Sequence, residues 1–338
     1  MIDLSVLAII CIAMALVFDF LNGFHDAANA IATVVVTRVL SPLQAVILSA
    51  CANFVGAFIF SVAIANTIGK GIVDINCITV PLIFAALIGA VIWNILTWLW
   101  GLPTSSSHAL IGGLIGSAVA ATGWKSVIIG GVVKIFAFIL MAPLLGMLGA
   151  MIFTTITMWL VRRMRPNIIN SLFRRLQLVS AAFYSVGHGT NDAQKTMGVI
   201  AITLYSAHLT DSFHVAPWII ISCYCAIALG TAFGGWRIVR TMGTRITKIR
   251  SMEGFCAESS SALVLLGTAH FGIPVSTTHV IAGSIFGVGS VERAGKVRWG
   301  MARKIIWAWI MTIPATALCG FLAYQFLAIL AHFGLFKI

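Results

Sequence analysis

The feature that most limits the possible folds of this chain is a set of long apolar runs without a charged side chain. Lys, Arg, Asp and Glu are absent from residues 43–65, 81–121, 215–236 and 305–336, and residues 127–161 contain only Lys134. A helix of about 20 apolar residues crosses the hydrocarbon core of a bilayer, and a helix pairs all its backbone groups internally. We therefore predict an all-α integral membrane protein.

The basic excess of the chain fits the same prediction. The formal net charge is +12, but the lysines and arginines cluster between the apolar runs, where they set the orientation of a membrane protein. We therefore expect the lipid bilayer, and no nucleic acid, as a partner. The seven cysteines lie mostly inside apolar segments without metal-binding spacing, so we expect no resident metal and no cofactor.

Two motifs occur twice in the same order, which indicates an internal duplication. Asp192 stands 166 residues after Asp26, with a matching glycine and alanine beside each. A proline, a hydroxyl cluster and a histidine occur at 103–108 and again, 171 residues later, at 274–279. The predicted domains are a first transmembrane repeat at 1–161, a basic loop at 162–175 and a second transmembrane repeat at 176–338.

The basic residues also predict how the two repeats lie in the membrane. The loop at 162–175 carries five arginines, which makes it cytoplasmic under the positive-inside rule. The flanks of the second proline turn are basic as well, whereas the matching flanks in the first repeat, 66–80 and 122–126, are nearly neutral. Matching segments then lie on opposite sides of the membrane. We predict two inverted-topology repeats with the amino terminus outside.

Each repeat is expected to begin with a broken helix. Residues 4–36 are too long for one straight span, and a break is predicted at 22–23. Residues 176–205 are expected to cross the membrane with a break at 187–189. Such a break would place a carboxylate near the middle of the membrane, because Asp26 and Asp192 follow closely. Discontinuous helices of this kind form the substrate sites of secondary transporters.

Asp26 and Asp192 are the first candidates for chemistry, because an ionised carboxylate in hydrocarbon costs roughly 2.5 kcal/mol or more. Such a group needs a cation or a proton. The residues predicted to couple a cation or a proton are Asn22, Asp26, Asn29, Asn191, Asp192, Lys195 and Glu258. The alternative is that these polar groups bond only one another across helices, and that Glu258 merely faces a pore.

The two proline turns are expected to form the tips of re-entrant helical hairpins at 81–121 and 251–288. The arm at 109–121 is too short to cross a bilayer alone. Each turn carries hydroxyls at the start of a helix, whose backbone N–H groups favour a tetrahedral oxyanion. The residues predicted to bind it are Ser105, Ser106, Ser107, Ser276, Thr277 and Thr278. The alternative for each turn is an ordinary N-cap.

These motifs resemble the inorganic phosphate transporter (PiT) family in its bacterial low-affinity branch. The resemblance rests on GFHDAANAIAT at 23–33, HGTNDAQKTMG at 188–198 and the paired PTSSSH and PVSTTH turns. It implies a symporter of the bacterial inner (plasma) membrane, a homodimer, that carries inorganic phosphate, free or as a metal–phosphate complex, with a cation. It also implies cation ligation at Asp26, Asn29 and Asp192, with phosphate held by the hairpin turns.

Lys195 departs from this family's pattern. In sodium-coupled members an asparagine stands three residues after the second aspartate, where this chain has Lys195. A tethered ammonium can neutralise Asp192 without sodium, so of the two coupling ions, H⁺ and Na⁺, we expect a proton. The alternative is that Lys195 only pairs with Asp192 or phosphate and never exchanges a proton.

Three other functions compete with phosphate symport: a sulfate permease, an intramembrane aspartyl protease, and a passive channel, whose transport would not depend on a cation gradient. Sulfate permeases share this family, and sulfate is tetrahedral as well, so the spacing of the motifs does not separate the two anions. An intramembrane aspartyl protease would use Asp26 and Asp192 as a dyad that shares a proton. A protease has no need of duplicated hydroxyl turns, and we therefore expect no enzyme activity.

Overall fold

The computed structural model describes residues 4–58, 62–292, 295 and 297–333. Within these ranges the regular structure is helical and no strand is present, as the apolar runs predict. The first half contains α1 (Leu4–Val36), α2 (Pro42–Val55), α3 (Ala63–Gly71), α4 (Val80–Trp100), α5 (Ser106–Thr122) and α6 (Ile129–Val161). The second half contains α7 (Pro166–Ser206), α8 (Pro217–Phe233), α9 (Trp236–Arg240), α10 (Ser251–His270), α11 (Thr277–Glu292) and α12 (Trp299–His332).

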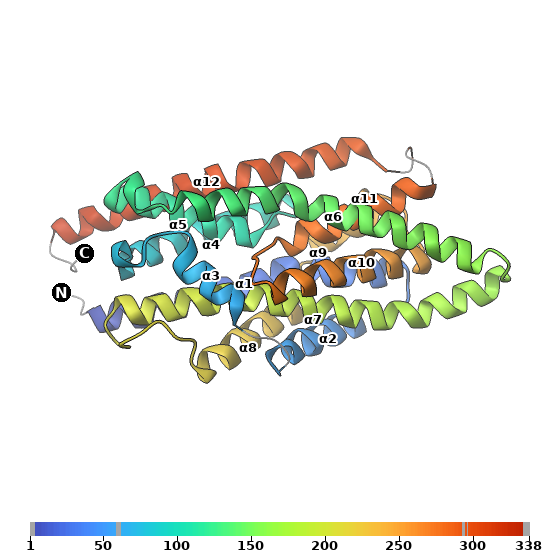
Figure 1. The fold of residues 1–338 in the computed structure, drawn as a ribbon, viewed down its shortest axis with the longest axis horizontal. Coiled ribbons are helices and arrows are strands. Elements are labelled where there is room, and N and C mark those ends of the chain that lie inside the picture. The colour runs from blue at the N-terminus through green and yellow to red at the C-terminus, as the bar shows by residue number, and fades with distance from the viewer. Residues whose placement is uncertain (1–3, 59–61, 293–294, 296, 334–338) are drawn as a thin grey trace.

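The helices form an elongated bundle, and most of them run along its long axis (Figure 1). The start of α1 and the end of α12 lie at one end of the bundle, while the junction between α6 and α7 lies at the opposite end. Both halves therefore make an odd number of passes along the axis. This agrees with the expectation that the central loop and the chain ends lie on opposite sides of a membrane.

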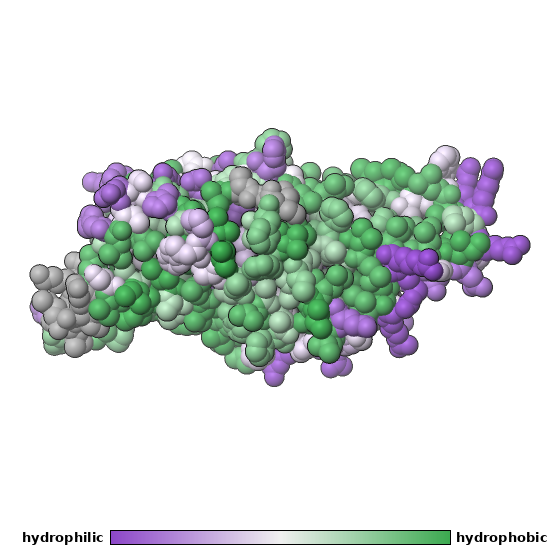
Figure 2. Space-filling view, turned by 90° about the horizontal axis from the view of Figure 1, so that it is seen from below, coloured by the Kyte–Doolittle hydropathy of each residue, from purple (hydrophilic) through white to green (hydrophobic). Residues whose placement is uncertain are grey.

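The surface of the bundle suits a bilayer. Figure 2 shows a broad apolar surface along its length and strongly hydrophilic side chains gathered at one end. Four described helices, α1, α4, α6 and α12, are long and apolar enough to cross a membrane, and up to six spans result if two bent helix pairs each count as one. The chain is thus an integral membrane protein, as predicted.

The second arm of each hairpin packs on a helix of the other half. The second arm of the first hairpin, α5, packs on α12, and its counterpart α11 packs on α6. Glycines make both contacts close: a Cβ on Gly116 would meet the carbonyl of Ala317, and one on Gly287 would meet the carbonyl of Met147. Each hairpin is therefore held by the last helix of the other half.

The predicted positions of the helix breaks are wrong. Both α1 and α7 are continuous α-helices through residues 22–23 and 187–189. Gly23 lies against the backbone of Ile227 in α8, and Gly189 lies against Asn53 in α2, so these glycines permit close helix contacts and do not interrupt the helices. The broken helices are the pairs formed by α2 with α3 and by α8 with α9, whose members are bent by 82° and 61°.

Both predicted hairpins are present. The turn after α4 and the turn after α10 contain Gly101 and Gly272, whose φ angles of 66° and 63° require the left-handed conformation that glycine adopts without strain. The hydroxyl of Thr241 donates to the carbonyl of Gly101 at 2.9 Å, and that of Thr67 donates to the carbonyl of Gly272 at 2.8 Å. The segments beyond the bends in the broken pairs thus hold the turn of the opposite half's hairpin.

The glycine contact between α5 and α12 predicts the effect of one added methyl group. Gly116→Ala should destabilise the protein by about 1–3 kcal/mol, because the new Cβ would overlap the carbonyl of Ala317. Gly267→Ala is the matched control, since its Cβ would meet no atom within 4 Å, and it should stabilise α10 by about 0.5–1 kcal/mol. The thermal unfolding midpoint of the purified protein measures both. Equal midpoints for the two variants would contradict the packing.

Candidate functional site

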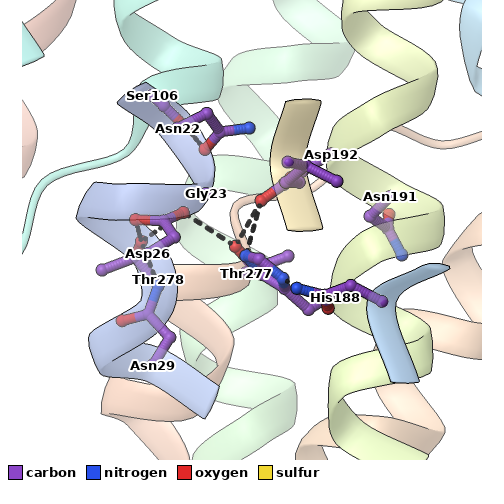
Figure 3. Close-up of polar contacts among 12 residues, drawn as sticks. Asn22, Gly23, Asp26, Asn29, Ser106, His188, Asn191, Asp192, Thr277 and Thr278 are labelled. Carbon is purple, nitrogen blue, oxygen red and sulfur yellow. Dashed lines mark hydrogen bonds and ion pairs between the residues drawn. The ribbon is translucent and has the colours of Figure 1, made fainter. Parts of the chain in front are cut away.

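The two aspartates of the duplicated motif face each other from α1 and α7, with Thr277 between them (Figure 3). The hydroxyl of Thr277 lies 3.2 Å from a carboxylate oxygen of Asp26 and 3.0 Å from one of Asp192. Both carboxylates are buried, with 2% and 0% of their surface exposed. A threonine hydroxyl has only one proton to donate, so the two carboxylates share a single donor at this point.

The second hairpin also reaches the first half of the site through Thr278. Its hydroxyl lies 3.2 Å from Asp26 and accepts a hydrogen bond of 2.9 Å from the side-chain amide of Asn29. The carbonyl of Thr104, in the first hairpin turn, lies 3.2 Å from the same hydroxyl. Thr278 therefore joins both hairpins to α1.

The first hairpin makes the matching contacts. Ser106 donates a hydrogen bond of 2.5 Å to the side-chain oxygen of Asn22, and Ser107 accepts a hydrogen bond from the ammonium of Lys195. Ser107 corresponds to Thr278, and Lys195 corresponds to Asn29, by the two offsets of the duplication. Each hairpin thus contacts the duplicated motif with residues at equivalent positions.

Lys195 is the cation of the site. Its ammonium lies 2.5 Å from Asp192 and donates 2.9 Å to the carbonyl of Val275, besides its bond to Ser107. An ammonium has three donors, and here each has an acceptor. Only 2% of the lysine is exposed, so its charge is held inside the bundle.

The first of the three hydroxyls predicted to bind the anion in each turn has a structural task. Ser105 accepts from the backbone N–H of His108, and Ser276 accepts from that of His279, each at 3.2 Å. These two hydroxyls are N-caps, which was the alternative stated above. The caps fix the starts of α5 and α11 beside the aspartates, and the first N–H groups of a helix have no partner within it.

The two hairpin tips touch each other. The rings of His108 and His279 lie 4.7 Å apart, and His279 stacks on Trp309 of α12 at 3.9 Å between ring centroids. The indole N–H of Trp309 donates to the carbonyl of Pro103 at 2.9 Å. The histidines of the two turns therefore pack the tips together and lie outside the acidic pair.

Two predicted residues do not join the acidic pair. The amide of Asn191 donates to the carbonyls of Gly187 and Leu265 at 3.0 and 2.9 Å, and its side chain lies apart from both Asp26 and Asp192 (Figure 3). Glu258 belongs to a separate buried cluster, where it accepts from Gln177 at 3.0 Å and from Ser180 at 2.5 Å.

Sequence reasoning missed two histidines of the site. His25 bonds Asp26 at 3.2 Å, and Nε2 of His188 lies 3.3 Å from Asp192, although without hydrogen-bond geometry. One ligand atom each from Asp26, His188 and Asp192 lie within 4.8 Å of one another, so this group could hold a cation. The duplication offered a signal, because His188 occupies the position that matches Asn22.

A third carboxylate lies in the same part of α1. Asp19 is completely buried one heptad before Asp26, and neither of its oxygens has a hydrogen-bond partner in the described part of the chain. An ionised group buried without partners is costly. The core of α1 and α7 therefore carries three carboxylates against one ammonium.

Comparisons with known proteins identify the family of the chain. The model of the phosphate transporter family (PHO4) matches residues 22–320. The chain is 53% identical to a protein of Rhizobium meliloti (strain 1021) named "Probable low-affinity inorganic phosphate transporter", over 93% of this chain and 94% of that one. A protein of Bacillus subtilis (strain 168) with the same name is 43% identical, over 95% and 97% of the two chains.

A solved structure shares the fold. It is titled "The sodium-dependent phosphate transporter" and superposes with a TM-score of 0.86 at 24% identity, covering 96% of this chain and 99% of that one. The relatives are named as transporters, in agreement with the expectation of no enzyme activity. From the buried acidic pair, the paired hairpin turns and these matches together, we conclude that the chain belongs to the phosphate transporter family.

Proposed function

We propose that this protein is a secondary active symporter that carries inorganic phosphate, free or as a metal–phosphate complex, across the inner membrane together with a cation. The observation that carries the proposal is the charge of the core. Asp19, Asp26 and Asp192 are buried with Lys195 as their only buried ammonium in the described part of the chain. Excess buried negative charge needs a bound cation or a proton, which is what a coupling ion supplies.

The first half of the site is the proposed place for the exchangeable ion. The hydrogen bonds of Asp26, to His25, Thr277 and Thr278, are all shared or long, at 3.2 to 3.4 Å. The side-chain oxygen of Asn29 has no hydrogen-bond partner in the described structure. A carboxylate and a carboxamide oxygen that both lack strong donors attract a small cation, while protonation would give Asp26 a donor of its own.

The hairpin turns are the proposed phosphate site. The starts of α5 and α11 supply backbone N–H groups and the positive ends of two helix dipoles, and Ser106, Ser107, Thr277 and Thr278 supply hydroxyls. In this structure these hydroxyls bond the motifs on α1 and α7. Bound phosphate would accept hydrogen bonds from these hydroxyls in place of their present partners on α1 and α7. Occupancy of the anion site would thereby change the hydrogen bonding of the aspartates.

We propose a proton as the coupling ion. Lys195 already pairs with Asp192, and all three of its N–H donors have acceptors. A fixed ammonium at this place leaves no need for a second sodium ion. Glu258, buried between Gln177 and Ser180, is a further candidate to carry a proton.

We propose that the protein forms a homodimer and that each subunit consists of two inverted repeats. The amino terminus would lie outside and the central loop in the cytoplasm. The arginines of that loop support this orientation. The opposite positions of the loop and the chain ends in Figure 1 are consistent with it.

The first prediction concerns the driving force. Labelled phosphate should enter proteoliposomes when a proton gradient is imposed, and most uptake should persist when choline replaces sodium. Asp26→Asn should reduce uptake roughly 10- to 100-fold, as expected for a charged interaction of about 1.5–3 kcal/mol. Asp211→Asn, in an exposed loop, is the control.

Loss of uptake without sodium, together with no response to the proton gradient, would contradict proton coupling. Sulfate added in excess should compete weakly if phosphate is the substrate. Stronger uptake of sulfate than of phosphate would reassign the anion.

The second prediction concerns the anion site. Ser106→Ala and Thr277→Ala should each weaken apparent phosphate affinity by about 0.5–3 kcal/mol, because each removes a hydroxyl donor to a charged oxyanion. Ser290→Ala is the control, since its hydroxyl bonds only the carbonyl of Phe286 in its own helix. Concentration dependence of the initial uptake rate gives the affinities. Unchanged affinity in the double variant would exclude the turns as the phosphate site.

The third prediction concerns the buried ion pair. Asp192→Asn should destabilise the protein by about 3–5 kcal/mol, because Lys195 would keep a buried charge without its carboxylate. The double change Asp192→Asn with Lys195→Gln should recover much of this loss. Thermal unfolding in detergent measures both proteins. If the double variant is no more stable than the single one, Lys195 is not held as an ammonium by Asp192.

A further inference from the structure

A cavity lies beside the second hairpin, outside the acidic site. It has a volume of about 340 Å³ and lies between α3, α6 and the turn that follows α10. Its polar wall is formed by two lysines and two uncharged hydrogen-bonding side chains, and its inner wall by the turn. The residues used in the argument are Asn66, Thr67, Lys70, Lys134, Ile273 and Pro274.

Close backbone contact brings the two lysines to one cavity. Gly71 ends α3, and a Cβ on Gly131 of α6 would overlap its carbonyl, so the two helices touch at these glycines. Lys70 precedes Gly71 by one residue, and Lys134 follows Gly131 by one helical turn. Two positive charges far apart in the sequence therefore line the same open cavity, and both lysines are exposed.

The cavity has no negative charge of its own. Its lining contains no carboxylate, and neither lysine has an ion pair in the described structure. Asp74, the acidic residue nearest to Lys70 in the sequence, instead accepts from the backbone N–H of Asn76 at 3.0 Å. The ammonium of Lys70 lies 4.7 Å from the ring centroid of Phe213, a contact that leaves its charge uncompensated.

Lys134 is unusual in its helix, because it is the single charge within residues 127–161. A lysine in a membrane helix can extend to the interface, which would explain its presence without a ligand. Extension alone does not explain why it shares a cavity with a second unpaired lysine. Two like charges in one cavity repel each other, and a bound anion would remove that cost.

We propose that this cavity is a second anion site, which binds an oxyanion of the phosphate type between Lys70 and Lys134. Asn66 and Thr67 add hydrogen-bonding side chains. Pro274 in the inner wall precedes Val275, whose carbonyl accepts from Lys195. The bound anion thus lies behind the turn that forms the central site, on the side that the predicted topology assigns to the exterior.

The phosphate group has two sources, free inorganic phosphate and the headgroup of an anionic lipid. The test uses the purified full chain in phosphatidylcholine nanodiscs and measures, by peptide mass spectrometry, the rate at which an amine-reactive acylating reagent modifies each lysine. Inorganic phosphate at millimolar concentration should slow modification of Lys70 and Lys134 at least threefold. Lys125, which is exposed like Lys70 and Lys134 but does not line the cavity, is the internal control.

A second arm replaces inorganic phosphate with nanodiscs that contain phosphatidylglycerol. Protection by phosphate alone identifies the free anion, and protection by phosphatidylglycerol alone identifies a lipid headgroup. In either case Lys70→Gln should abolish protection of Lys134, because the two lysines share one ligand, while Lys125→Gln should not. Absence of protection in both arms, or equal protection of Lys125, would overturn the proposal.

A further variant distinguishes phosphate binding in the cavity from phosphate binding at the central site. Thr277→Ala weakens the proposed central phosphate site, yet protection of Lys70 and Lys134 should remain. If protection disappears in Thr277→Ala, phosphate acts through the central site and the cavity is not a second one. The readout needs no transport, so it stands apart from the test of symport.

Discussion

The structure depends on how two carboxylates are kept inside an apolar bundle. Asp26 on α1 and Asp192 on α7 share the hydroxyl of Thr277. Burial of a charged group is tolerated when donors surround it. Here Thr277 and Thr278, at the tip of the second hairpin, supply donors in addition to those of His25 and Lys195. The hairpins, the bent helix pairs that hold their turns and the exchanged packing of α5 and α11 together place the hydroxyls of the turns against the motifs that carry these carboxylates.

Much of the fold could be predicted, because apolar runs and a duplication leave a clear pattern. The helical class and both hairpins were predicted from charge-free runs and proline turns. The breaks in α1 and α7 were predicted wrongly, since a glycine in a long helix can mark either a break or a close contact. Gly23 and Gly189 make contacts with α8 and α2. The sequence around a glycine does not show whether another helix packs against it.

The residues of the site could be predicted better than the hydrogen bonds that join them. The duplicated motif identified Asp26 and Asp192, but not that one hydroxyl lies between them. Asn191 was grouped with Asp192 because they are adjacent, although adjacent helical residues point about 100° apart. The cluster around Glu258 depends on how α7 meets α10, which requires the tertiary structure. His188 could have been found by reading the duplication position by position.

Comparison of the two motifs position by position also shows how Lys195 differs from its counterpart in the first half. The two halves supply nearly equivalent hydroxyls, but Asn29 in one half is replaced by an ammonium in the other. In the proposed mechanism the charge at Asp192 and Lys195 stays constant while Asp26 gains and loses its cation or proton. Only one half of a duplicated site then changes charge during transport. A single fixed cation inside the bundle therefore reduces by one the number of ions that must enter with each anion.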